Sequence, residues 1–235
     1  MNDDRRGLDW FPLAAGLLFA GGMALLLWAA LVYAPRERTM GDVQRIFYFH
    51  VPAATNALLA FLGALVGAVG YLATRRESWD RVLRATVETG VLWATVVLVT
   101  GPIWARAAWG AWWTWEPRLV TTLIAWLVYV GALLVRRISH DPEQGARLAA
   151  ILAIVGFLDL PIVYKSVDWW RGNHPVVFGR SGGGLAPEML RAFLLGMLGL
   201  TLAHAGLLLL RWRLARVEDA VAAAERVADM EEGLR

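Results

Sequence analysis

Six long apolar segments divide this chain, and they constrain its fold more than any other feature of the sequence. An α-helix rises about 1.5 Å per residue, so about 20 apolar residues are needed to cross the roughly 30 Å hydrocarbon core of a bilayer. The segments that reach or approach this length cover residues 11–33, 51–73, 83–102, 119–135, 148–165 and 188–210. The sequence therefore predicts an all-α polytopic membrane protein with six transmembrane helices.

The composition agrees with this prediction and argues against other classes. Of the 235 residues, 58% are hydrophobic and 18% are charged, whereas a soluble domain is about a quarter charged. The first apolar segment is longer than the roughly 7–15 apolar residues of a signal peptide, so we expect an uncleaved helix there. No linker or internal repeat divides the sequence, and residues 1–235 are expected to form a single membrane domain.

Six crossings would place both termini on one side of the membrane and the first, third and fifth loops on the other. Arginine and lysine are enriched in the cytoplasmic loops of membrane proteins. Here the paired arginines at 75–76 and 136–137 lie at segment ends on the side of the termini. We therefore expect cytoplasmic termini, with the loops at 34–50, 103–118 and 166–187 on the external side.

Residues 211–235, which follow the sixth apolar segment, are expected to form a cytoplasmic tail. Apolar residues recur there every three or four positions, at Leu214, Val217, Val221, Ala224 and Ala228. This spacing is typical of an amphipathic helix, which would lie on the membrane surface or contact a partner. A solvated helical tail fits the same spacing.

Tryptophan is concentrated in the third loop, where five of the 13 tryptophans lie within residues 104–115. Four side chains have the i, i+3, i+4, i+7 spacing of one helix face, and these are Trp109, Trp112, Trp113 and Glu116. The spacing predicts a short helix in this external loop, ended by Pro117. Tryptophans often form a belt at the membrane interface, but a belt is spread over many helix ends. The concentration on one loop favours a platform for a flat, apolar ligand.

Two histidines lie on the same predicted face as the tryptophan loop. His50 directly precedes the second apolar segment and is expected to open its helix, and His174 follows Trp169 and Trp170 in the fifth loop. Neutral imidazole is a good iron ligand, and two imidazoles on opposite sides of the ring would give six-coordinate haem. The alternative for each histidine is an ordinary hydrogen-bonding residue at the membrane interface. The chain has no cysteine, so any haem would be held without covalent attachment, as in b-type haem proteins.

Other candidates accompany these two histidines. His204 lies inside the sixth apolar segment, where an ionisable residue is a functional candidate by default, and it is a second candidate ligand. Arg45, Arg118 and Arg171 lie near the predicted haem contacts. Arginine binds carboxylates through two hydrogen bonds, so these residues could hold haem propionates. Contact with lipid headgroups is an equally good explanation for each arginine taken singly.

Three stretches of the sequence resemble a known family. Residues 109–119 read W-G-A-W-W-T-W-E-P-R-L, which is similar to the tryptophan-rich WWD signature of haem-handling proteins of cytochrome c maturation. Residues 41–54 and 165–174 resemble the segments around the two external histidines of the CcmC family. The resemblance covers essentially the whole chain. One departure is Glu116, which stands where the signature usually has aspartate and is followed by Pro117.

The resemblance implies haem handling on the periplasmic face of the bacterial inner membrane. It implies axial iron ligation by His50 and His174, with Arg118 as the arginine of the motif. The implied platform residues are Trp109, Trp112, Trp113 and Trp115. It also implies delivery of haem to a CcmE-like chaperone, together with CcmA- and CcmB-like ABC transporter subunits and a small CcmD-like membrane protein.

Two other functions fit parts of the sequence. A b-type electron-transfer anchor would place its histidine ligands inside helices, and only His204 matches that arrangement. A permease subunit for another amphiphilic anion would need more polar groups inside the apolar segments. The chain is expected to be a haem carrier and not an enzyme. It has no glycine-rich phosphate-binding motif, so any ATPase would be another chain.

Overall fold

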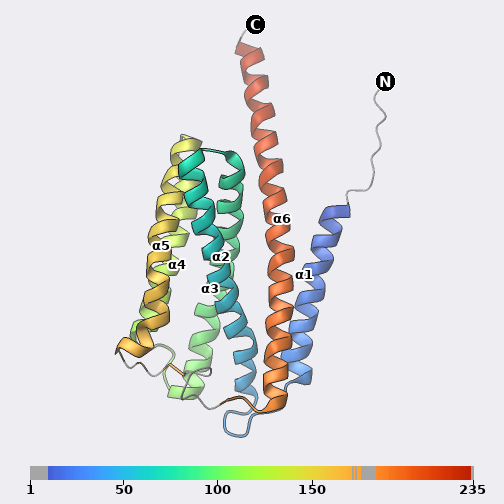
Figure 1. The fold of residues 1–235 in the computed structure, drawn as a ribbon, viewed down its shortest axis with the longest axis vertical. Coiled ribbons are helices and arrows are strands. Elements are labelled where there is room, and N and C mark those ends of the chain that lie inside the picture. The colour runs from blue at the N-terminus through green and yellow to red at the C-terminus, as the bar shows by residue number, and fades with distance from the viewer. Residues whose placement is uncertain (1–9, 171, 173, 176–183, 234–235) are drawn as a thin grey trace.

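A computed structural model of the chain describes residues 10–170, 172, 174–175 and 184–233. It contains six long helices that are apolar enough to cross a membrane, which confirms the predicted six-span all-α fold (Figure 1). Their bounds are α1 (Trp10–Trp28), α2 (Phe47–Thr74), α3 (Glu77–Trp109), α4 (Pro117–Ile138), α5 (Pro142–Trp170) and α6 (Pro187–Gly233). A π-helical turn, η1 (Ala29–Tyr33), extends α1, and a short 3-10 helix, η2 (Asp42–Ile46), precedes α2.

The connections between helices alternate between the two ends of the bundle, as predicted from the six crossings (Figure 1). The connections α1–α2, α3–α4 and α5–α6 lie at one end, which we call the loop end. The short connections α2–α3 and α4–α5 lie at the other end, where Arg75 pairs with Glu143 at 3.9 Å. His50, the tryptophan loop and His174 therefore belong to the same end of the molecule.

The tryptophan loop itself is not helical, so the predicted short loop helix is wrong. Gly110 adopts a left-handed conformation (φ 76°) and ends α3 directly after Trp109, and a C-terminal glycine in this conformation is a common helix stop. Pro117 occupies the first turn of α4, where its missing N–H is not needed. The six residues between them, 111–116, form no helix. Trp109 is thereby held on α3, apart from the tryptophans of the loop.

The C-terminal tail is helical, as its spacing predicted, but it is not a separate helix. It continues α6 without a break, so that α6 is 47 residues long and extends beyond the ends of the neighbouring helices (Figure 1). The apolar side chains Val217, Val221 and Val227 on this extension are each about half exposed.

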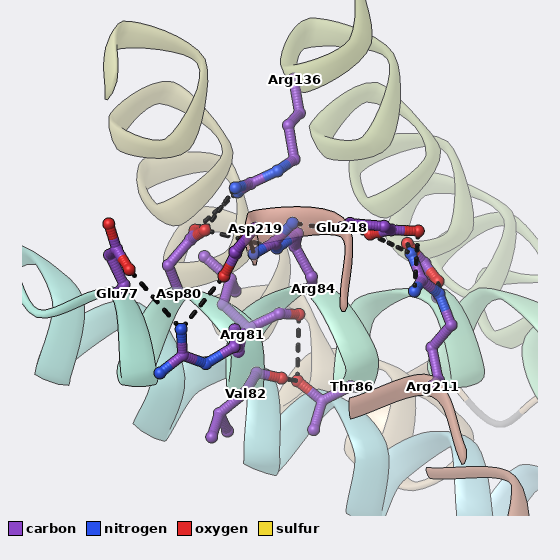
Figure 2. Close-up of polar contacts among 12 residues, drawn as sticks. Glu77, Asp80, Arg81, Val82, Arg84, Thr86, Arg136, Arg211, Glu218 and Asp219 are labelled. Atoms are coloured by element: carbon purple, nitrogen blue, oxygen red, sulfur yellow. Dashed lines mark hydrogen bonds and ion pairs between the residues drawn. The ribbon is translucent and has the colours of Figure 1, made fainter. Parts of the chain in front are cut away.

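An ion-pair network fixes the base of this extension to the end of the bundle opposite the loop end (Figure 2). The carboxylate of Asp80 in α3 is buried and accepts hydrogen bonds from both terminal nitrogens of Arg136 in α4, one of them at 2.6 Å. Arg84 contacts Asp80 at 3.4 Å and also pairs with Asp219 of α6. Arg81 donates a second hydrogen bond to Asp219 at 3.1 Å. Three helices are thus joined through charged groups that are largely shielded from solvent.

We expect Asp80→Ala to lower the free energy of unfolding by about 3–5 kcal/mol, because it leaves Arg136 and Arg84 partly buried without their shared carboxylate. Thermal unfolding of the detergent-purified protein measures this loss. Glu77→Ala is the matched control, since Glu77 is an exposed residue of the same helix that pairs with Arg81 at 3.6 Å. Its effect should stay below about 1 kcal/mol. Equal effects of the two substitutions would contradict a structural role for the buried pair.

Candidate functional site at the loop end

His50 lies in the first turn of α2, and the packing of its neighbours directs it towards α3. Phe47 and Tyr48 are buried between α1 and α6, with the ring of Phe47 5.2 Å from that of Phe193. His50 faces the other way, and its Nδ1 lies 2.9 Å from Oγ1 of Thr100 in α3. The apolar side of this helix turn is therefore buried in the bundle, while the imidazole is held against a neighbouring helix.

His174 is brought from the α5–α6 connection to the tryptophan loop. Its ring lies 6.5 Å from that of Trp109 in an edge-on arrangement, and its Nδ1 is 3.8 Å from Oε1 of Glu116. Glu116 fills the space beside Gly172, since a Cβ atom on that glycine would lie 3.0 Å from Oε2 of Glu116. The acid of the tryptophan-rich motif thus brings the third loop against the segment that carries Gly172 and His174.

The His174 imidazole is neutral near pH 7. Burial, the guanidinium of Arg118 and the neighbouring imidazole of His50 together lower the pKa of His174 to about 3, and burial is the largest of these causes. The 3.8 Å separation from Glu116 is also longer than a hydrogen bond. The contact is therefore not an ion pair at neutral pH. A neutral ring keeps an unprotonated nitrogen, which is the form that binds a metal.

This pKa predicts how stability depends on pH. Between pH 6.5 and about 3 the unfolded chain binds a proton on His174 that the folded protein does not bind, so the free energy of unfolding falls as the pH drops through this range. His174→Gln removes the titrating group. We expect wild type and this variant to differ in melting temperature by an amount that changes steadily below about pH 6.5 and is constant above it. A difference independent of pH would contradict the lowered pKa.

The tryptophans are arranged in three groups at the loop end. Trp109 packs edge-on against Trp104 at 5.3 Å, on the side of α3 that meets His174. Trp113 and Trp115 form a second edge-on pair at 5.9 Å, and Trp169 and Trp170 at the end of α5 form a third at 5.7 Å. Trp112 belongs to none of these pairs, and together with Trp115, Trp169 and Trp170 it is among the most exposed tryptophans of the loop end. Exposed indoles at the end of a helix bundle are typical both of the membrane interface and of a binding surface.

The arginine candidates are already engaged with protein groups. Arg118 donates to the backbone carbonyls of Val163 and Tyr164 in α5, both at 3.3 Å, and it lies close enough to His174 to influence its pKa. Arg45 donates to the carbonyls of Ala30 and Leu31 at 2.7 and 3.0 Å.

The Arg45 contacts have a local cause in the sequence. In a π-helical turn the carbonyl of Ala30 would pair with residue 35, but Pro35 has no N–H. The guanidinium of Arg45 supplies the missing donor and ties η2, which precedes α2, to η1, which extends α1. Arg171 lies outside the described residues.

His204 is not brought together with the other two histidines. It is 6% exposed in the middle of α6, and its Nδ1 lies 3.0 Å from Oδ1 of Asn56. Asn56 is six residues further along α2 than His50, which corresponds to about 9 Å of helix. The ring of His204 also packs edge-on against Trp93 at 6.2 Å. In this structure His204 therefore makes a polar contact between helices inside the bundle.

Sequence reasoning missed two residues that contact His50, namely Thr100 and Gly101. Gly101 lets the α3 backbone approach the imidazole, since a Cβ atom there would lie 3.3 Å from Cε1 of His50. The sequence carries no distinctive signal for either residue. Threonine in a membrane helix commonly bonds to its own backbone, as Thr100 does with Val96 at 2.7 Å.

Comparison with known proteins places this chain among haem exporters. The family model described as "Heme exporter protein C" matches residues 4–227. Heme exporter protein C of Bradyrhizobium diazoefficiens is 34% identical over 199 residues, which is 84% of this chain and 73% of the relative. That of Escherichia coli K12 is 29% identical over 206 residues, or 88% of this chain and 82% of the relative. A putative cytochrome c biosynthesis ccmC-like mitochondrial protein of Arabidopsis thaliana is 33% identical over 179 residues, 76% of this chain and 67% of its own length. The chain therefore belongs to the Heme exporter protein C (CcmC) family.

Proposed function

We propose that this chain binds haem at the loop end and passes it to a CcmE-like haem chaperone during the maturation of c-type cytochromes. The observation that carries the proposal is the position of His174. The fold brings this residue from the fifth connection onto Trp109 and Glu116 of the tryptophan-rich motif. His50 also lies near enough to influence the pKa of His174.

Each part of the site would make a different contribution to haem binding. The imidazoles of His50 and His174 would bind the iron from opposite sides, as neutral rings do in other haem proteins. The exposed indoles of Trp112, Trp115 and Trp169 would cover the apolar faces and edges of the macrocycle. Without cysteine, no thioether bond can form between haem and this chain. Haem held only by coordination and contact can be released.

Release to a chaperone requires that the site lie on the periplasmic side of the inner membrane. The paired arginines at 75–76 and 136–137 lie at the end opposite the site, and the positive-inside rule assigns that end to the cytoplasm. There the chain would meet CcmA- and CcmB-like ABC transporter subunits, and a CcmD-like protein would accompany the assembly. ATP hydrolysis would belong to the CcmA-like subunit.

A haem-transfer assay tests this proposal against an electron-transfer role. The purified chain is loaded with haem in detergent and mixed with the soluble domain of a CcmE-like chaperone, with serum albumin as a non-specific haem acceptor. We expect the Soret absorption of the chain to fall as the chaperone gains haem, faster than transfer to albumin. Haem that stays on the chain and is reduced rapidly by a quinol would instead identify a b-type electron-transfer anchor.

A further inference from the structure

Thr100 lies where it can determine which nitrogen of His50 carries the proton. Its hydroxyl has one hydrogen, and Oγ1 lies 2.7 Å from the backbone carbonyl of Val96, an acceptor that cannot donate. The same Oγ1 lies 2.9 Å from Nδ1 of His50. Both contacts are hydrogen bonds only if the hydroxyl donates to Val96 and accepts the proton of His50 Nδ1–H.

We infer that Thr100 is a positioning residue that holds His50 in the Nδ1–H tautomer, so that its Nε2 presents a lone pair to the iron of haem. This inference rests on the proposed function, because it concerns the ligand that would bind the haem. A hydrogen bond from the other ring nitrogen is the usual way in which proteins orient a metal-binding histidine and raise its basicity. Here the acceptor is a neutral hydroxyl of the neighbouring helix.

The packing around His50 strengthens this arrangement. Gly101 follows Thr100, and its lack of a side chain lets the α3 backbone approach Cε1 of the imidazole. The ring is therefore restricted by a hydrogen bond at Nδ1 and by the backbone next to Cε1. Because His50 lies within α2 and Thr100 within α3, two regular helices fix the direction of Nε2 before haem arrives. Such preorganisation lowers the cost of binding.

The first test needs no haem. The protein is labelled with ¹⁵N at its four histidines, and the ring nitrogens of His50 are assigned by comparison with His50→Gln. In wild type we expect the signal of Nε2 to be that of an unprotonated nitrogen and the signal of Nδ1 to be that of a protonated one. Thr100→Val, which preserves side-chain shape, should give averaged signals from both tautomers, and Thr100→Ser should restore the wild-type pattern. An unprotonated Nδ1 in wild type would overturn the inference.

The second test measures haem release. With apomyoglobin in excess as the haem acceptor, Thr100→Val should lose haem about 10-fold faster than wild type, as expected when a partner of a metal ligand is removed. Thr100→Ser should stay within about twofold of wild type, because serine keeps the accepting oxygen.

Thr95→Val is the matched control for the release measurement. Thr95 lies in the same helix, donates to Val91 at 2.7 Å and accepts a hydrogen bond from Trp126 Nε1 at 2.9 Å. Thr95→Val therefore loses an interhelical hydrogen bond to a threonine hydroxyl, as Thr100→Val does, but away from His50. Its rate of haem release should not differ from that of wild type. Equal release rates for Thr100→Val and wild type would overturn the inference. Unchanged haem binding in His50→Ala would instead overturn the proposed ligand, and the tautomer result would still stand by itself.

Discussion

Replacing both His50 and His174 with alanine is expected to remove the Soret absorption of haem from the purified protein. With both imidazoles gone, the iron loses both proposed axial ligands, and contact with tryptophan alone would leave it without protein coordination. Each single substitution should leave a weaker, spectrally altered complex, because one imidazole remains. Absorption and electron paramagnetic resonance spectra of the protein, reconstituted with equal amounts of haem, measure these changes.

The other two histidines provide the controls for this experiment. His140 is exposed in the short α4–α5 connection, at the end opposite the proposed site, and His140→Ala should bind haem as wild type does. His204→Ala should also keep its haem, but it should lose about 1–3 kcal/mol of stability because Asn56 loses a buried hydrogen-bond partner. A double variant of His50 and His174 that keeps the wild-type spectrum would refute the proposed ligation. If a His204 variant loses haem while it remains folded, the haem site would instead lie in the interior of the bundle.

The six-helix fold could be predicted from the sequence because it depends on length and hydropathy. A membrane-spanning segment must be apolar over about 20 residues, and nothing else in the chain imitates this signal. The alternation of the connections follows from the number of crossings, which is why His50 and His174 could be placed at one end. The apolar segments do not mark helix ends, however. For example, α3 continues seven residues past position 102, to Trp109.

The interior of the site could not be predicted, because its contacts join residues that are distant in the sequence. The spacing of the tryptophans matches one face of a helix and therefore predicted a loop helix. Gly110 and Pro117, however, leave too few residues between them for a stable helix. The partner of His50 is 50 residues away on another helix. The backbone contacts of Arg45 depend on a π-helical turn that ends at Tyr33, two residues before Pro35. Residue types and spacing identified the participants, whereas packing determined which groups meet.

A side chain at Gly22 is expected to separate α1 from α6 and to destabilise the protein by about 3 kcal/mol or more. A Cβ atom on Gly22 would lie 2.5 Å from the backbone nitrogen of Ala203 and from the carbonyl oxygen of Gly199. Gly199 makes the reciprocal approach, since a Cβ atom there would lie 2.7 Å from the carbonyl of Gly22 and the nitrogen of Leu26. These neighbours are backbone atoms of two long helices, so they cannot move aside as a flexible side chain would.

The membrane makes this contact difficult to replace. Helices in lipid associate through close packing and hydrogen bonds rather than through the hydrophobic effect, so α1 gains nothing from apolar burial once the backbones are apart. The damage should also extend to the loop end, because the carbonyls of Ala30 and Leu31 in η1, the turn that extends α1, accept the hydrogen bonds of Arg45. We therefore expect Gly22→Val to lower both the melting temperature and the amount of haem bound.

Gly21→Val is the matched control, because it places the same side chain one residue earlier in the same helix. A Cβ atom on Gly21 meets nothing within 4 Å, so this variant should keep both the melting temperature and the haem content of wild type. The two substitutions have the same helix propensity and change the apolar surface of α1 by the same amount. A difference between them can come only from the face of the helix that carries the side chain. If Gly21→Val and Gly22→Val have the same melting temperature, the close α1–α6 contact does not hold α1 in place. The proposal that this contact supports the hydrogen bonds of Arg45 would then be wrong as well.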